Sequence, residues 1–138
     1  MKLGYKKLGD YIQLVDERNK NLEVETLLGV SVKKKFIKSI ANTNGTDFTK
    51  YKKVKKNEFT YISDTSRRGD KIGIALLKQE NVALVSQAYS VFKIKDFDEL
   101  IPDYLMMWFC RPEFDRYARF KSHGSVREIF DWEEMCAI

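Results

Sequence analysis

The two prolines of the chain, Pro102 and Pro112, constrain the fold more than any other feature of the sequence. Each stands where the first turn of a helix would begin, and each is followed by an acidic residue and then by apolar or aromatic residues. This pattern predicts helices over 101–110 and 112–121, and a further helical turn over 130–135. Before residue 95, short β-branched and apolar segments alternate with turn signals. Strands followed by helices indicate an α+β domain.

The first part of the chain predicts one helix and several strands. Tyr5, Leu8, Ile12 and Val15 recur at spacings of three and four, which predicts a short amphipathic helix over 5–16. We expect strands in 27–40 (one or two, around the lysines at 33–35), 51–56, 58–63, 72–77 and 82–94, the last as one long strand. The predicted fold is therefore a mixed or antiparallel twisted sheet with an N-terminal helix and C-terminal helices, in a single domain over 1–138.

Composition excludes several classes of protein. Hydrophobic residues make up 43% of the 138 residues, so a folded core is expected rather than disorder. No apolar run approaches the roughly 18–20 residues that a membrane span needs, and the charged N-terminus does not match a secretory signal. Cys110 and Cys136 give neither a disulfide framework nor metal-ligand spacing, and Cys110 is expected to pack in the core. We expect a cytoplasmic protein with no membrane association, no metal and no cofactor.

The positive charge is concentrated in one part of the sequence. The whole chain carries 25 Lys and Arg against 20 Asp and Glu, a net charge of +5, but residues 33–56 hold nine lysines and one acid. The flanking parts are neutral or slightly acidic. Such a cluster is typical of a surface that binds a polyanion, and a solvated lysine-rich loop that serves solubility is the alternative.

Three polar loops, 41–50, 63–71 and 122–127, are the candidate sites of DNA contact, since basic side chains bind phosphates and polar side chains bind base edges. The alternative for the arginines is ion pairing with nearby acids, among them Asp64, Asp70, Glu113, Asp115 and Glu128. The predicted DNA-binding residues are Lys33, Lys34, Lys35, Lys38, Asn42, Asn44, Lys50, Lys52, Lys53, Lys55, Arg67, Arg68, Arg116, Arg119, His123, Ser125 and Arg127.

The sequence lacks the usual motifs for chemistry on nucleic acids. None of the 18 lysines has an acidic residue two positions before it, so the Asp/Glu-x-Lys pair of metal-dependent nucleases is absent. There is no Gly-Lys-Ser/Thr for a phosphate-binding loop, and one histidine with two cysteines is too few for a zinc site. We therefore predict no catalytic residues.

Three segments have a distinctive order and spacing: KLGDYIQLVDERN at 7–19, RRGDKIGIALLKQENVALVSQAYSVFKI at 67–94, and IPDYLMMWFCRPEFDRYARFKSHGSVREIFDWEEM at 101–135. In this order and spacing they resemble the target-recognition domain of the specificity subunit of type I restriction-modification enzymes. Together they span most of the chain, and 33–60 matches least. That segment is expected to vary with the DNA sequence that is read.

The resemblance implies an α+β domain similar to the DNA-recognition domain of an adenine DNA methyltransferase, with no chemistry of its own. It would read one half of a gapped site in double-stranded DNA and direct modification and restriction subunits to that site. The family continues into a spacer helix and a second recognition domain, which are absent after Ile138. The resemblance thus implies either a truncated chain or a half-subunit. The alternative functions are a protein-interaction module with a solvated lysine face, and a small nucleic-acid enzyme with an unrecognised site.

Overall fold

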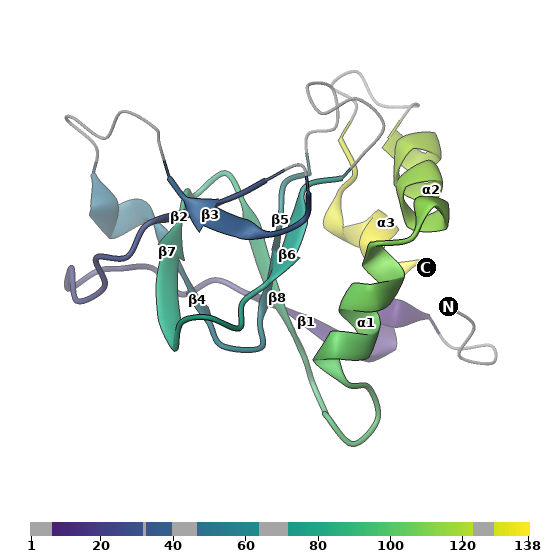
Figure 1. Cartoon of the computed structure of the whole chain (residues 1–138), viewed down its shortest axis with the longest axis horizontal. Coiled ribbons are helices and arrows are strands. Elements are labelled where there is room, and N and C mark those ends of the chain that lie inside the picture. The colour runs from purple at the N-terminus through teal and green to yellow at the C-terminus, as the bar shows by residue number, and fades with distance from the viewer. Residues whose placement is uncertain (1–6, 32, 40–46, 64–71, 123–128) are drawn as a thin grey trace.

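A four-stranded antiparallel sheet forms the centre of the computed structural model, which describes residues 7–31, 33–39, 47–63, 72–122 and 129–138 (Figure 1). Its strand order is β1-β8-β5-β6. The strands are β1 (Ile12–Val15), β8 (Ser90–Ile94), β5 (Phe59–Tyr61) and β6 (Ile74–Leu76). The N-terminal part of the chain thus meets the second half of the chain in this sheet, since β1 pairs with β8 through Ile12–Ile94 and Val15–Val91.

Two further antiparallel strand pairs lie beside this sheet. β2 (Leu28–Val30) pairs with β3 (Phe36–Lys38), and β4 (Lys52–Lys55) pairs with β7 (Val82–Val85). A bridge between Leu27 and Leu84 links the start of the β2–β3 hairpin to β7. Two short 3-10 helices, η1 (Leu8–Asp10) and η2 (Phe48–Lys50), precede β1 and β4.

Three helices follow the last strand and lie together on one side of the molecule (Figure 1). They are α1 (Pro102–Phe109), α2 (Pro112–Ser122) and α3 (Trp132–Cys136). Both prolines occupy the first helical turn, where the missing N–H costs no hydrogen bond. The carboxylate of Asp131 caps α3 by accepting from the backbone N–H of Glu134 at 3.0 Å.

The central sheet separates two apolar cores. On one face, aromatic residues of the sheet pack against the three helices: Phe59 stacks on Phe92 at 4.9 Å, and Phe109 meets the Phe59 ring edge-on at 5.7 Å. On the other face, Val91 packs in a cluster with Val54 of β4 and Leu77, which follows β6. Because neighbouring residues of a strand point to opposite faces, Val91 and Phe92 serve different cores.

The predicted α+β class and the antiparallel sheets are confirmed. The strands predicted around 33–35 and in 51–56, 58–63 and 72–77 are present, and so are all three predicted C-terminal helices. The described part of the 5–16 segment, by contrast, is not a helix: it forms η1 and then β1. Ile12 and Val15 match a helical spacing, but they point into the two different cores, and pairing with β8 decides the conformation.

The prediction of one long strand over 82–94 is also wrong. Residues 86–89 form a turn in which the N–H of Tyr89 donates to the carbonyl of Ser86 at 3.0 Å, and the Ser86 hydroxyl accepts from Ala88 at 3.3 Å. A serine that bonds the backbone two residues on favours such a turn. The two halves then join different strand pairs, β7 with β4 and β8 with β1 and β5.

Cys110 is likewise not a core residue. It follows α1 as its C-cap and is exposed, although it ends the apolar run LMMWFC. None of the described helices combines the length and the apolar character needed to cross a membrane.

Candidate nucleic-acid interface

Lys34 differs from the prediction that it binds phosphate, because its ammonium group is buried inside the protein. The side chain of Lys34 is 6% exposed, and Nζ donates to the carbonyl of Phe109 at 2.6 Å and to Asp115 Oδ1 at 2.8 Å. It also lies 5.2 Å from the centre of the Phe114 ring. With these partners the Lys34 ammonium is not available to DNA.

The backbone of Lys34 shows why this turn presents one lysine inward and its neighbours outward. The φ angle of Lys34 is 62°, in the left-handed region, which costs a residue with a β-carbon about 1–2 kcal/mol. The turn is closed by hydrogen bonds from Lys34 N to Ser31 O at 3.1 Å and from Ser31 N to Lys35 O at 2.9 Å. Lys33 and Lys35 on either side are exposed.

Asp115 joins the β2–β3 turn to α2 and to the start of the segment that leads into β6. Besides the Lys34 ammonium, Asp115 Oδ1 accepts from the backbone N–H of Ile72 at 2.9 Å. The side chain of Asp115 is 12% exposed. Three parts of the chain that are distant in sequence therefore meet at one carboxylate.

The exposed arginines Arg116 and Arg119 lie on the same helix as Asp115. Arg119 is four residues beyond Asp115, so it lies on the same side of α2, one turn further along. Arg116 lies 3.5 Å from the carboxylate of Glu113, with both side chains more than half exposed, so the ion pair that was the alternative for this residue is present. An exposed pair of this kind contributes little to stability and leaves the arginine able to exchange partners.

A groove of about 810 Å³ separates the β2–β3 turn from α1. The residues that line it are Lys33, Lys34, Lys35, Phe36, Leu76, Lys78, Gln79, Asp103, Met106, Met107 and Cys110. Lys78 pairs with Asp103 across part of it at 3.3 Å. The turn thus presents Lys33 and Lys35 at one edge, while the methionines of α1 form an apolar opposite wall.

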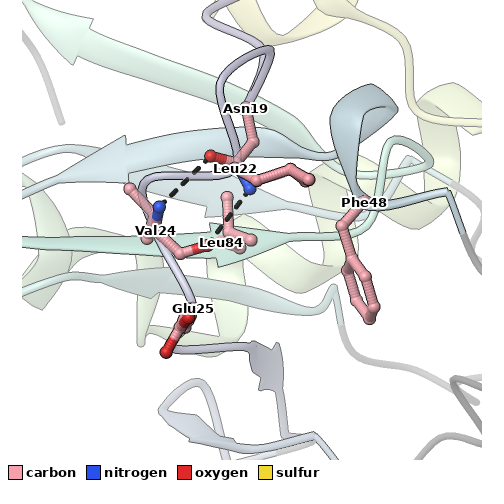
Figure 2. A pocket seen from close by; sticks show the side chains of 6 residues that line it. All are labelled: Asn19, Leu22, Val24, Glu25, Phe48 and Leu84. Atoms are coloured by element: carbon pink, nitrogen blue, oxygen red, sulfur yellow. Dashed lines mark hydrogen bonds between the residues drawn. The ribbon is translucent and has the colours of Figure 1, made fainter.

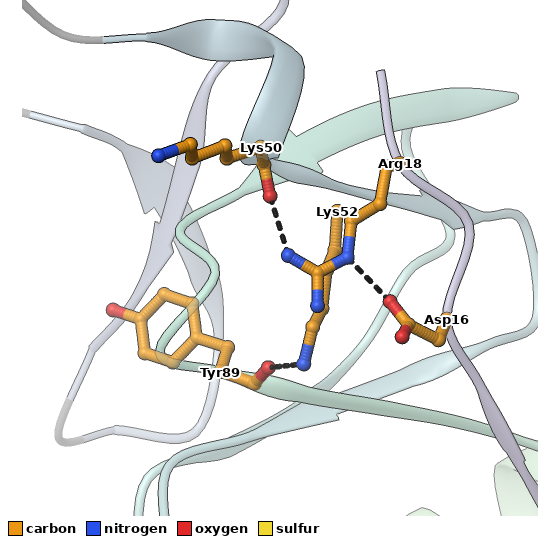
Figure 3. A network of polar contacts seen from close by, with 5 residues as sticks. All are labelled: Asp16, Arg18, Lys50, Lys52 and Tyr89. Carbon is orange, nitrogen blue, oxygen red and sulfur yellow. Dashed lines mark hydrogen bonds and ion pairs between the residues drawn. The ribbon is translucent and has the colours of Figure 1, made fainter. Parts of the chain in front are cut away.

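The lysines of η2 and β4 form a separate group, in which the ammonium of Lys52 has a partner within the protein (Figure 3). Lys52 is half-buried and donates from Nζ to the carbonyl of Tyr89 at 2.7 Å. Arg18 donates to the carbonyl of Lys50 at 2.7 Å and is paired with Asp16. Lys52 therefore departs from the prediction that its ammonium group is available to a phosphate.

These contacts change the pKa values of Lys52 and Asp16. Burial lowers the pKa of the Lys52 ammonium, the nearby Arg18 guanidinium lowers it further, and Asp16 acts in the opposite direction. The hydrogen bond from Arg18 lowers the pKa of Asp16. The Lys52 ammonium thus holds the turn before β8 against β4, and the Arg18 guanidinium holds the end of η2.

The remaining lysines of this group differ in exposure. Lys55 is exposed and pairs with Glu17 at 3.2 Å, whereas Lys53 is half-buried. Lys38, at the end of β3, and Lys50, at the end of η2, are exposed. The nine lysines that are close in sequence are therefore distributed over two areas, the β2–β3 hairpin, whose turn lies beside α1 and α2, and the η2–β4 segment with the residues that follow it.

A small hollow of about 230 Å³ lies near η2 and contains none of the predicted site residues (Figure 2). It is lined by Asn19, Leu22, Val24, Glu25, Phe48 and Leu84. The buried Asn19 closes the 19–24 loop by donating to the carbonyl of Val24 at 3.1 Å and accepting from its N–H at 3.3 Å. The hollow therefore lies beside a closed loop and is not part of the candidate interface.

Seven predicted site residues lie outside the described part of the chain: Asn42, Asn44, Arg67, Arg68, His123, Ser125 and Arg127. Described residues next to these segments are held by backbone hydrogen bonds. Ser63 O accepts from Phe130 N at 2.7 Å, and Ile72 N reaches Asp115 on α2. Within the described residues, no group of three or more His, Cys, Asp or Glu side chains could hold a metal ion.

Sequence reasoning missed the part played by Asp115 and by Arg18. Asp115 appeared only as one of several acids that could pair with an arginine, and Arg18 lies outside the lysine cluster. Lys34 and Asp115 are 81 residues apart, so no local pattern signals their contact. No protein-family model matches the chain, and no curated protein matches it in sequence.

Proposed function

We propose that this chain binds double-stranded DNA and reads its sequence without catalysing a reaction. The observation that carries the proposal is the docking of the lysine turn onto α2: exposed Lys33 and Lys35 flank a buried lysine whose ammonium is bound by Asp115. This arrangement holds two exposed lysines and the exposed Arg116 and Arg119 on neighbouring, fixed elements. Cations on elements that are fixed relative to one another can contact several phosphates of one duplex.

The more specific role rests on the resemblance of 7–19, 67–94 and 101–135 to a type I target-recognition domain. In that role the chain reads one half of a gapped site in the cytoplasm, and modification and restriction subunits are its partners. The fold that this role would require, similar to the recognition domain of an adenine DNA methyltransferase, belongs to the same proposal. An α+β domain with antiparallel sheets and helices after the last strand is compatible with it.

One observation favours the alternative of a protein-interaction module. Three large apolar side chains of α1 and its N-cap are more than half exposed: Ile101, Tyr104 and Met107, the last at 69%. Exposed apolar residues gathered on one helix are typical of protein contact surfaces. The two functions share a boundary, since Met107 also lines the groove whose other edge carries Lys33 and Lys35, whereas Ile101 and Tyr104 lie outside that groove.

Binding to random-sequence duplex DNA, measured by fluorescence anisotropy across a range of salt concentrations, tests the proposal. If six or more phosphates are contacted, the affinity should fall by roughly a thousandfold between about 50 and 200 mM salt. The variant Lys33→Glu/Lys35→Glu should bind much more weakly, whereas Lys20→Glu, an exposed lysine outside the candidate interface, should bind like the wild type. Salt-independent binding, or equal binding by both variants, would remove the basis of the proposal.

The same protein incubated with plasmid DNA and Mg²⁺ should leave the plasmid intact. Cleavage would instead support a nucleic-acid enzyme with an unrecognised site. A selection from random oligonucleotides at moderate salt would then give the sequence that the chain prefers.

A further inference from the structure

We propose that the Lys34–Asp115 ion pair is a positioning device for DNA recognition, which sets the distance between the lysine turn and the arginines of α2. The inference rests on the proposed function, and adds to it that a lysine with no contact to DNA decides how well the chain discriminates between sequences. Three features of the pair, its burial, its multiple contacts and the backbone of Lys34, support a positioning role.

The first feature is that both charges are almost fully removed from water. The exposed fraction is 6% for the Lys34 side chain and 12% for the Asp115 side chain. A buried ion pair is an inefficient way to stabilise a fold, because desolvation offsets most of the attraction, and apolar residues of similar volume often do as well. Such a pair instead fixes the relative orientation of the two elements that carry it, since the ammonium and the carboxylate must keep a specific geometry.

The second feature is that each group binds two other parts of the protein at once. The Lys34 ammonium contacts both Asp115 and the last carbonyl of α1, at Phe109, at 2.8 Å and 2.6 Å. Asp115 also accepts from Ile72, at the start of the segment that forms β6. The turn is thereby fixed to the end of α1, to α2 and to the central sheet, so it cannot rotate about any one contact.

The third feature is the backbone of Lys34 itself. A left-handed φ of 62° is uncommon for lysine, and a glycine or asparagine would adopt it at lower cost. Backbone strain of this kind persists where the surrounding contacts enforce it and is concentrated at functional sites. Here it turns the Lys34 side chain inward while Lys33 and Lys35 remain exposed beside it.

The consequence for DNA binding is geometric. Cations that bind phosphates of one duplex must match the spacing of those phosphates, and base-reading side chains are in register only if the phosphate contacts are correctly placed. Lys33 and Lys35 lie on one side of the ion pair, and Arg119 lies one helical turn beyond Asp115 on the other. Loss of the pair would allow these groups to move relative to one another. Their charge would be unchanged, but they would no longer be aligned with the phosphates of the duplex.

The test compares three variants on two labelled duplexes, the target obtained by oligonucleotide selection and a scrambled duplex of the same composition. The variant Lys34→Met/Asp115→Asn removes both charges, nearly preserves the side-chain volumes and keeps an acceptor oxygen for Ile72. It should unfold in urea close to the wild-type midpoint but lose at least about tenfold of the affinity ratio between target and scrambled DNA. That is the discrimination supplied by about one correctly placed base contact.

The matched control is Lys33→Met, a neighbouring lysine that is exposed. It should weaken binding to both duplexes equally, because a phosphate contact carries no sequence information. It should also reduce the salt slope by about 0.9, the value for one lost phosphate contact. The double variant should leave the salt slope for scrambled DNA unchanged. If the double variant does not fold, Asp115→Glu, which keeps both charges and moves the carboxylate by one methylene, should show a smaller loss of discrimination in the same direction.

Three results would overturn the inference. Wild-type discrimination by the folded double variant would mean that the pair has a structural role only. A salt slope that the double variant reduces as much as Lys33→Met does would mean that Lys34 itself reaches a phosphate. Absence of DNA binding by the wild-type chain would instead overturn the proposed function, and the inference with it.

Discussion

Gly9 lies directly against Cys136. A β-carbon added at Gly9 would stand 2.7 Å from Cβ of Cys136 and 3.2 Å from its carbonyl oxygen and its sulfur. Next to this contact, the N–H of Leu8 donates to the carbonyl of Ile138 at 2.8 Å. The described chain thus begins and ends at one place, where η1 packs on α3.

Replacement of Gly9 by alanine should destabilise the protein. The contact is with the β-carbon and backbone of Cys136 rather than with the end of a flexible side chain, so η1 or α3 must shift, and such overpacking costs about 1–3 kcal/mol. Urea unfolding followed by circular dichroism measures the effect. Gly29→Ala is the control, because its β-carbon would meet only the Tyr89 hydroxyl, at an ordinary 3.7 Å. Equal stability of the two variants would contradict the close packing of η1 on α3.

Glu58 should make the protein lose stability as the pH rises above the ordinary pKa of a glutamate. Burial raises the pKa of the Glu58 carboxyl above its ordinary value of 4.5 and Glu17 raises it further, while the hydrogen bond from the Lys55 N–H and the charges of Lys55 and Lys93 oppose them. Between the unfolded and folded pKa values the folded chain holds a proton that the unfolded chain has released. Rising pH in this window therefore favours the unfolded state.

The variant Glu58→Gln should remove this dependence. Its free energy of unfolding, relative to that of the wild type, should increase between about pH 4 and pH 7, as measured by urea titration at both values. Glu80→Gln, at an exposed position, should run parallel to the wild type over the same range. A constant difference between Glu58→Gln and the wild type would show that Glu58 is not destabilised by burial.

Tyr61 should cause a second loss of stability on the alkaline side. Its side chain is fully buried beneath Phe92 and Phe130, and burial raises the pKa of its hydroxyl well above the ordinary value of 10.0. Above about pH 10 the unfolded chain releases this proton and the folded chain keeps it, so the free energy of unfolding falls by up to about 1.4 kcal/mol per pH unit. Tyr61→Phe should unfold at higher urea than the wild type at about pH 11. Tyr104→Phe, at an exposed position, should give no such gain.

The elements that could be predicted from the sequence are those set by local signals. α1 and α2 begin at prolines followed by acids, and this pattern is sufficient without any knowledge of their neighbours. β1 could not be predicted, because its conformation depends on pairing with β8 about eighty residues later. The break between β7 and β8 has a local signal in Ser86, but the strand that each half joins is a long-range property.

The sequence predicts which residue types form the candidate site, but it does not predict how their side chains are arranged. Three consecutive lysines, Lys33 to Lys35, have the same local sequence properties, and nothing in that sequence marks the middle one as buried. The distinction arises from a left-handed backbone at Lys34 and from a carboxylate 81 residues away. A lysine cluster in sequence therefore indicates a basic protein region, while the partner of each ammonium group decides which members can bind DNA.

This difference between lysines leads to a prediction about DNA affinity. Lys33 and Lys35 are exposed and form no ion pair with the described residues, whereas Lys52 donates to Tyr89 and Lys55 pairs with Glu17. An ammonium group that already has a protein partner gains less from a phosphate, so the two pairs of lysines should contribute unequally. Lys33→Gln/Lys35→Gln should reduce the slope of log affinity against log salt by about 1.8, which corresponds to two phosphate contacts.

Lys52→Gln/Lys55→Gln removes the same charge and should reduce that slope by less than one contact, about 0.9. It should also lower the urea midpoint, because Lys52 no longer holds the carbonyl of Tyr89, whereas the Lys33/Lys35 variant should retain the wild-type midpoint. Anisotropy titrations of a labelled duplex at several salt concentrations measure both slopes. Equal slope changes would mean that net charge alone attracts DNA, and that the docking of the β2–β3 turn on α2 does not select which lysines bind.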